Sequence, residues 1–268
     1  MLVKSNLPAS DYVANAYIGC PHKCSYCYAS FMRRFTGHTN EEWGSFLDIK
    51  EYASDKIPKC LGGKTVLLSS VTDPYNPFEA KYHATRKLLE RLLNTDAHIE
   101  ILSKSDLMLA DLDLLKQFRD LSVGISLNTT DDSFRKDMEP DAPSVERRLK
   151  ALERLHAEGI RTYLFISPIF PYITDISELL KATAGTIDMV CFENLNLRGA
   201  AKEKILGYIN RSEKYHRYHE LYKSIYEKGN MDYWRDLEAD IDGLSHDYDI
   251  PFVKYFYHDK IRKGKKND

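Results

Sequence analysis

Three of the five cysteines of this chain, Cys20, Cys24 and Cys27, fall within eight residues near its start. A [4Fe–4S] cluster takes four thiolates, so three cysteines from one loop leave one iron atom free to bind a small molecule. Zinc sites often combine two closely spaced pairs of ligands, and this sequence has no second cysteine pair. His22 lies between two of the cysteines, which is a poor position for a fourth ligand. The loop therefore predicts a catalytic iron–sulfur site, with structural zinc as the alternative.

The composition is that of an ordinary globular protein, with 43% hydrophobic and 29% charged residues. A net charge of −2 gives the molecule as a whole no attraction for nucleic acid. No apolar run reaches the ~18 residues of a spanning helix, and the first residues lack the layout of a signal peptide. In a reducing compartment an odd number of cysteines favours metal or redox chemistry over disulfides. We therefore expect a cytoplasmic protein without membrane contact.

Short β-rich runs alternate with amphipathic helical stretches over most of the chain. Six strands alternating with helices predict a parallel sheet, and the length suits a single α/β barrel. We predict a partial (β/α)6 TIM-type barrel over residues 1–199. Strands are expected at residues 12–19, 65–71, 98–103, 122–127, 161–166 and 189–192, and helices at residues 83–93, 112–118, 145–158 and 176–184.

Residues 200–268 are predicted to form a helical extension packed on the barrel, with a long helical region at 203–227, a second helical stretch at 233–244 and an apolar run at 251–256. Four tyrosines recur at the three-and-four spacing of one helix face, which favours burial against the barrel. Aromatic residues interleaved with basic ones can also stack on a nucleotide, so both interpretations stay open. The basic run at 260–266 is a solvated tail or a phosphate contact. The four tyrosines are Tyr215, Tyr218, Tyr222 and Tyr226.

A polar cluster follows each expected strand. The carboxyl ends of parallel strands meet at one end of a barrel, so these clusters and the cysteine loop are expected to share one mouth. Beyond the cysteine loop, the clusters are residues 69–74, 103–105, Asn128, 167–168 and 193–194.

The pattern CxxxCxxC, with an aromatic residue before its last cysteine and a strand before its first, resembles the signature of the radical S-adenosylmethionine (SAM) superfamily. Other segments are similar to the spore photoproduct lyase group, also labelled DNA repair photolyase-like. The resemblance covers residues 16–175 and implies that Cys20, Cys24 and Cys27 hold a [4Fe–4S] cluster whose open iron chelates SAM. One electron from that cluster then cleaves a C–S bond to give a 5′-deoxyadenosyl radical. The segments are CPHKCSYCY, SSVTDPYNPFE, LSKS, MEPDAPSVERRLKAL and ISPIFPYITD.

The resemblance also implies four contacts to SAM, at Thr72, Lys104, Ser126 and Ser167. A lysine and hydroxyl groups can supply charge-assisted and neutral hydrogen bonds to a carboxylate and a ribose. For Ser126 and Ser167 the alternative is a buried hydroxyl that caps the backbone. Asp73 either accepts from the methionyl ammonium or closes the turn before Pro74.

The sequence departs from spore photoproduct lyase at the cysteine that returns a hydrogen atom to the repaired base, where Ser70 stands. An alcohol O–H bond is far stronger than a thiol S–H bond, so serine is a poor hydrogen-atom donor. Cys191 could replace the lost thiol, although a lone cysteine in an apolar run is more often part of the core. Tyr26 and Tyr28 match tyrosines of the lyase's hydrogen relay; alternatively, they shield adenine and the cluster.

The segment EPDAPS, which begins at Glu139, is predicted to be a mainly structural turn. Ser144 is expected to cap the following helix, and Asp175 the next one. Arg147 and Arg148 are predicted to lie on the surface or at the barrel rim.

Three functions follow. The first is a radical enzyme acting on a nucleobase, which makes a nucleic acid a candidate partner. The second is a radical enzyme acting on a peptide, a protein or a small metabolite. The third is a non-catalytic iron–sulfur electron carrier or sensor. The resemblance implies an electron donor such as flavodoxin or ferredoxin, and a second radical SAM protein is a candidate partner; the sequence does not specify an oligomeric state.

Overall fold

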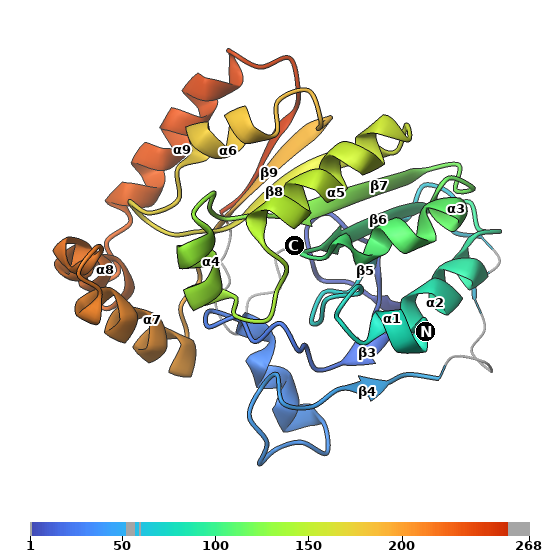
Figure 1. Ribbon diagram of the computed structural model, residues 1–268, viewed down its shortest axis with the longest axis horizontal. Helices are drawn as coiled ribbons and strands as arrows, with labels where there is room; N and C mark the ends of the chain where they lie inside the picture. The colour runs from blue at the N-terminus through green and yellow to red at the C-terminus, as the bar shows by residue number, and fades with distance from the viewer. Residues whose placement is uncertain (1, 52–56, 59, 257–268) are drawn as a thin grey trace.

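A computed structural model describes residues 2–51, 57–58 and 60–256. It is built on a curved eight-stranded sheet in the order β1-β2-β5-β6-β7-β8-β9-β10, with helices on its outer side (Figure 1). All neighbours from β2 to β10 pair in parallel, and β1 (Leu2–Lys4) pairs antiparallel with β2 at one edge. This mostly parallel α/β arrangement is a partial TIM-type barrel, which confirms the predicted fold class.

Six of the parallel strands coincide with runs expected from the sequence. β7 is buried along its whole length, as is typical of a central strand covered on both faces. β10 was not predicted, and it pairs with β9 so that Phe252 lies opposite Val190. The parallel strands are β2 (Tyr12–Ala14), β5 (Thr65–Leu68), β6 (His98–Ser103), β7 (Leu121–Ser126), β8 (Arg161–Ile169), β9 (Met189–Asn194) and β10 (Phe252–Tyr255).

The first expected strand, over residues 12–19, is in fact two strands. β2 ends at Ala14, and β3 (Tyr17–Ile18) leaves the main sheet to pair antiparallel with β4 (Asp48–Ile49). The fully buried Tyr17 fixes this departure, since its hydroxyl donates to the carboxylate of Glu79. The cysteine loop therefore follows β3 and lies across the mouth of the barrel.

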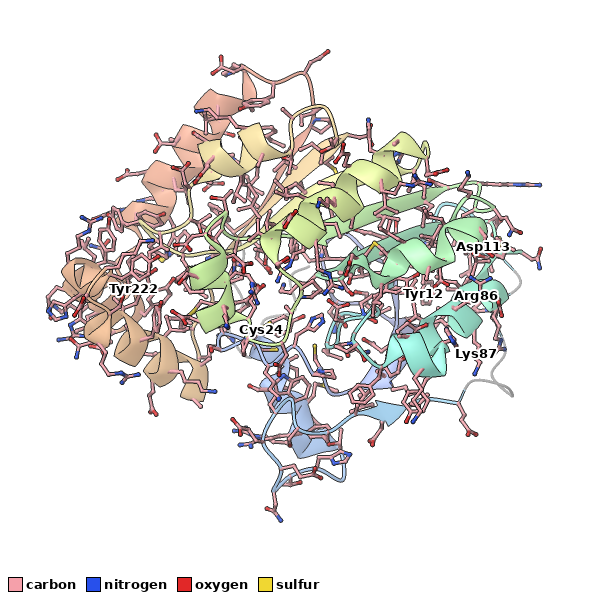
Figure 2. All side chains as sticks on the ribbon, in the orientation of Figure 1. Tyr12, Cys24, Arg86, Lys87, Asp113 and Tyr222 are labelled. Atoms are coloured by element: carbon pink, nitrogen blue, oxygen red, sulfur yellow. The ribbon has the colours of Figure 1, made fainter. Side chains whose placement is uncertain are left out.

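The helices that join β5 to β9 cover the outside of the sheet (Figure 1). In Figure 2, Arg86 and Asp113 lie side by side on two of these helices, and their side chains form an ion pair at 2.8 Å. These elements are α1 (Glu79–Tyr82), α2 (Ala84–Leu92), η2 (Asp106–Asp111), α3 (Leu112–Leu115), α4 (Asp132–Met138), α5 (Val145–Ala157) and α6 (Ile176–Ala182).

The predicted helix caps are present. The Ser144 side chain accepts from the backbone N–H of Arg147 at the start of α5, and Asp175 accepts from that of Glu178 at the start of α6. Gly159 follows α5 with φ +78°, a conformation that glycine adopts without a side-chain penalty.

Three helices and a short 3-10 turn connect β9 to β10. They are α7 (Ala200–Arg211), η3 (His216–Tyr218), α8 (His219–Tyr226) and α9 (Asp232–Ser245). The helical region expected over 203–227 is present but is not continuous, because Ser212 adopts an extended backbone after α7 and its hydroxyl accepts from the N–H of Tyr215. The segment after residue 199 thus returns a strand to the barrel sheet, and the domain boundary placed there stays a prediction.

The tyrosine stripe of this region packs on the barrel. Tyr222 is fully buried, and its hydroxyl donates to the carbonyl oxygen of Pro171 at 3.0 Å. Tyr226 donates to the carbonyl oxygen of Leu195 at 3.2 Å. Within the described ranges, no helix is long and apolar enough to cross a membrane. The basic run at 260–266 lies outside the described residues.

Candidate active site

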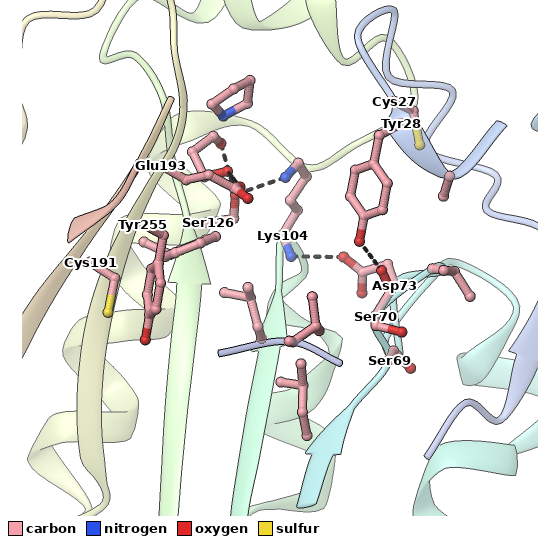
Figure 3. Close-up of a pocket in the computed structure, with 18 of the residues that line it drawn as sticks. Cys27, Tyr28, Ser69, Ser70, Asp73, Lys104, Ser126, Cys191, Glu193 and Tyr255 are labelled. Atoms are coloured by element: carbon pink, nitrogen blue, oxygen red, sulfur yellow. Dashed lines mark hydrogen bonds between the residues drawn. The ribbon is translucent and has the colours of Figure 1, made fainter. Parts of the chain in front are cut away.

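A cavity of about 250 Å³ opens at the mouth of the barrel (Figure 3). The cysteine loop forms one wall, and residues at or just beyond the ends of the strands form much of the rest. All twelve residues predicted for the site line this one cavity. They are Cys20, Cys24, Tyr26, Cys27, Tyr28, Ser70, Thr72, Asp73, Lys104, Ser126, Ser167 and Cys191.

The three cysteines are free thiols and are partly exposed. Gly19 precedes them with φ +91°, and a side-chain carbon there would lie 2.3 Å from the carbonyl oxygen of Phe46. Only glycine fits this approach, so Gly19 shapes the entry to the loop. This role of Gly19 was not expected from the sequence.

The three thiols favour their protonated form when no metal is bound. Burial raises the pKa of all three, to about 12 for Cys20, where Asp73 adds to the effect, and well above the ordinary value for Cys24. Cluster iron would hold them as thiolates. Among the residues that the structure describes, no three metal-binding side chains meet at a single-ion site. A [4Fe–4S] cluster does not need such a meeting point, because each thiolate binds a different iron atom.

Asp73 closes the turn after β5. Its carboxylate accepts from the backbone N–H of Tyr75 at 2.9 Å, from Ser103 Oγ at 2.6 Å and from the backbone N–H of Lys104 at 2.8 Å. Burial would raise its pKa, but these bonds and the His22 imidazole at 3.4 Å hold the pKa at about 2. These contacts favour the structural interpretation of Asp73 over a direct ligand contact.

Lys104 reaches across the cavity to the neighbouring strand. Its ammonium nitrogen donates to Ser126 Oγ at 2.7 Å (Figure 3), and Ser126 Oγ lies 3.2 Å from the carbonyl oxygen of Ser167. The Ser167 hydroxyl donates to the Glu193 carboxylate, and the Thr72 hydroxyl donates to the carbonyl oxygen of Gly19. The hydroxyls thus have protein partners, while the ammonium, with three donors, can also serve a ligand.

The two tyrosines of the cysteine loop lie differently. The Tyr26 hydroxyl donates to Glu139, and the Tyr26 ring makes a T-shaped contact with Phe170, with centroids 5.6 Å apart. Tyr28 is 53% exposed, and its hydroxyl donates to the carbonyl oxygen of Ser70, as Figure 3 shows. Tyr26 is therefore part of the cavity wall, while Tyr28 lies at the rim.

Cys191 lies on β9, across the cavity from Ser70 (Figure 3). It is only 2% exposed. Burial, with Glu100 nearby, raises the pKa of this thiol to about 12, so it keeps its proton at neutral pH. A protonated thiol at a cavity wall is the form from which a hydrogen atom could be given.

Glu139 was expected only in a structural turn, and the prediction that Arg148 lies on the surface or at the barrel rim is wrong. Arg148 is fully buried, and it donates to the fully buried Glu139 carboxylate. Burial would raise the pKa of Glu139, but Arg148, Lys104 and Tyr26 keep it below its ordinary value. Arg147 does lie on the surface, paired with Asp106 at 2.6 Å.

The family model of the Radical SAM superfamily matches residues 15–182, which is more than half of the chain. The chain belongs to the radical SAM superfamily. It is 39% identical over 212 residues to an uncharacterized protein of Methanocaldococcus jannaschii, an alignment that covers 79% of this chain and 80% of that protein.

Two solved radical SAM structures share the fold. Spore photoproduct lyase complexed with dinucleoside spore photoproduct superposes with a TM-score of 0.58 at 17% identity, covering 80% of this chain and 64% of that one. This chain therefore spans less than two thirds of that lyase. Streptococcus suis SuiB bound to precursor peptide SuiA gives a TM-score of 0.55 at 14% identity, covering 96% of this chain and 52% of that one.

This membership makes the chain a radical SAM enzyme, whose cofactors are a [4Fe–4S] cluster and S-adenosylmethionine. The enzyme interpretation of the sequence is confirmed over the non-catalytic electron carrier.

Proposed function

We propose that Cys20, Cys24 and Cys27 hold the cluster and that the opposite wall of the cavity binds SAM. When bound and reduced, the cluster supplies one electron to the sulfonium of SAM, which yields methionine and a 5′-deoxyadenosyl radical that takes a hydrogen atom from the substrate. The single observation that carries this proposal is the shared cavity, which the three thiols and Lys104 line together; Figure 3 shows Cys27 and Lys104 among its side chains.

In this proposal Lys104 binds the carboxylate of SAM, because its positively charged ammonium group extends into the cavity as far as Ser126. Ser126, Ser167 and Thr72 complete the polar wall. Asp73 holds the backbone of Lys104 in place from the preceding turn. Tyr26 closes the cavity behind the cysteines, and Tyr28 shields its rim.

We propose a nucleic-acid base as the substrate. The fold shared with a lyase that was solved with a dinucleoside supports this proposal. Further support comes from an aromatic surface on the loop after β8, where the half-exposed Tyr172 stacks on Tyr218 with centroids 5.5 Å apart. Arg217 lies 4.8 Å from the ring centroid of Tyr218. Stacked rings with a nearby guanidinium are a suitable platform for a single-stranded base.

The hydrogen-atom donor in this proposal is Cys191 rather than Ser70. Cys191 lines the same cavity and keeps its proton, whereas the Ser70 hydroxyl has too strong an O–H bond for the task. A Cys191→Ser variant should still cleave SAM but should return fewer hydrogen atoms to the substrate radical.

A peptide, protein or small metabolite is the second candidate substrate. The presence of Ser70 in place of the lyase's cysteine favours it, as does the net charge of −2. The fold shared with SuiB, which was solved with a precursor peptide, adds support. A one-electron donor such as flavodoxin or ferredoxin is required in either case. A second radical SAM protein as partner and a cytoplasmic location stay predictions.

The experiment offers the reduced, reconstituted enzyme single-stranded DNA, thymine-dimer DNA or a peptide pool, each deuterated at its C–H positions. The proposal predicts that DNA raises the rate of SAM cleavage and that deuterium appears in 5′-deoxyadenosine. Stimulation and deuterium transfer from peptides alone would contradict the nucleobase proposal and support the second candidate. A Tyr172→Ala variant should weaken DNA stimulation without changing SAM cleavage in its absence.

A further inference from the structure

The cysteine loop rests on the turn that follows α4. The backbone N–H of Ser25 donates to the carbonyl oxygen of Met138 at 2.8 Å, and the backbone N–H of Asp141 donates to the carbonyl oxygen of His22 at 3.4 Å. At the surface, Lys23 and Asp141 form an ion pair at 2.8 Å with both side chains about half exposed. These contacts are distributed along the loop between Cys20 and Cys27, so the turn supports the whole stretch.

At the centre of this contact lies Glu139, a fully buried carboxylate. One of its oxygen atoms accepts from the hydroxyl of Tyr26, and the other accepts from the guanidinium of Arg148. Arg148 also donates to the carbonyl oxygens of Ser126 and Pro143, both at 3.0 Å. A buried ion pair is tolerated only when its partners are satisfied in this way, and losing one partner leaves a costly unpaired charge.

The same carboxylate also faces the opposite wall of the cavity. The ammonium nitrogen of Lys104 lies 3.8 Å from Glu139 Oε1, the oxygen that accepts from Tyr26. That ammonium also lies 6.0 Å from the centre of the Tyr26 ring. Glu139 is thus the point at which the cysteine loop and Lys104 meet within the protein.

We propose that Glu139 is a positioning residue that sets the cysteine loop and Lys104 in one fixed relationship. Tyr26 lies between Cys24 and Cys27, so anchoring its hydroxyl fixes the backbone that carries both thiols. The negative charge of Glu139 also holds the Lys104 ammonium between Glu139 and Ser126. This inference rests on the proposed function, because it gives the two walls the roles of cluster binding and SAM binding.

A role in folding alone would predict something different. A fold anchor would lower the thermal stability when removed, without altering the properties of the cluster or of SAM binding in the protein that still folds. A positioning role predicts that both properties change together in a folded variant. Outer partners of metal ligands typically affect metal affinity by about 10–100-fold, so the effect should be measurable.

The test uses the full chain with Glu139→Gln, which keeps the shape and removes the charge. Its matched control is Asp141→Asn, which removes a surface ion pair between the same turn and the same loop. We measure iron loss to a chelator, the electron paramagnetic resonance spectrum of the reduced cluster with and without SAM, and the Kd for SAM. Glu139→Gln should lose iron about tenfold faster, bind SAM about tenfold more weakly and show an altered spectrum. Asp141→Asn should match wild type within about twofold, as exposed pairs contribute little.

If Glu139→Gln does not fold, Tyr26→Phe decides the matter, because it removes one hydroxyl and leaves the pair between Glu139 and Arg148 intact. The proposal predicts faster iron loss from Tyr26→Phe and, where both fold, a double variant whose effect is less than the product of the two. A folded Glu139→Gln or Tyr26→Phe with wild-type iron retention, spectrum and SAM affinity would overturn it. These readouts need no turnover, so they separate this inference from a failure of the proposed function.

Discussion

The Lys104 ammonium donates to Ser126 Oγ at 2.7 Å and thereby joins the end of β6 to the end of β7 across the cavity. If this ammonium binds the carboxylate of SAM, Lys104→Met should weaken SAM binding by about 10–100-fold, which corresponds to the 1.5–3 kcal/mol of a charged hydrogen bond. Ser126→Ala should cost less, about two- to tenfold, because it removes a neutral partner. Equilibrium dialysis of reconstituted protein measures both, and a Lys104→Met variant that binds SAM normally would contradict the assignment.

The cluster assignment predicts different behaviour for two cysteines of one chain. Cys24→Ala removes a thiol from the cavity wall and should abolish the roughly four iron atoms and the visible absorbance of the reconstituted protein. Cys60 is exposed and does not line the cavity, so Cys60→Ser should retain both. Iron and sulfide analysis after anaerobic reconstitution measures the outcome. Equal iron content in the two variants would refute the ligand set.

Cys191 provides a prediction about pH. With a pKa of about 12, only about one Cys191 thiol in ten thousand is ionised at pH 8. Because the raised pKa favours the protonated form, reactivity should rise about tenfold for each pH unit from 8 to 10. At pH 8, iodoacetamide should modify Cys191 about a hundredfold more slowly than a free cysteine, whose pKa is about 8.5, because the smaller thiolate fraction outweighs the greater nucleophilicity of a thiolate with a higher pKa. Mass spectrometry of the peptide that contains Cys191 gives the rate, and modification at the rate of a free thiol would exclude the buried, protonated state.

Substitutions on α8 can test whether this helix is packed against the barrel through its tyrosines. Tyr222 is fully buried, whereas its neighbour Leu221 is 41% exposed (Figure 2 shows Tyr222 on this helix). Tyr222→Ala should lower the free energy of unfolding by about 3–5 kcal/mol, as for other large core truncations. Leu221→Ala should cost less than about 1 kcal/mol. Urea unfolding followed by circular dichroism measures both values, and similar losses would argue against the packing described.

The sequence predicts most of the barrel because parallel strands buried on both faces leave an apolar signal that alternates with helices. β10 was noted only as an apolar run at 251–256, because its place in the sheet depends on pairing with β9, about sixty residues earlier in the chain, which a local pattern does not show. The helical region expected over 203–227 is interrupted because the Ser212 hydroxyl accepts from the backbone N–H of Tyr215, and hydrophobic periodicity does not reveal such a bond. The polar clusters after the strands predicted the site better than periodicity predicted the helices, because the topology of a parallel barrel brings all strand ends to one mouth.

Arg148 shows what pattern analysis missed although the signal was present. On α5, Arg148 shares a helix face with Val145, Leu152 and Leu155, all of which are buried. This three-and-four spacing predicts that Arg148 faces the core. A buried arginine needs a charged partner, which here is the carboxylate of Glu139. The charge of Arg148 suggested the surface, and only its partner explains its burial.

The most direct test of the account is whether the reduced protein cleaves SAM. Reconstituted enzyme is mixed anaerobically with dithionite and SAM, and 5′-deoxyadenosine is measured by liquid chromatography, with Cys24→Ala treated identically. We predict that wild type forms 5′-deoxyadenosine and that Cys24→Ala forms none above background. Wild-type protein that carries an intact, reducible cluster and binds SAM, yet yields no more 5′-deoxyadenosine than Cys24→Ala, would contradict the account.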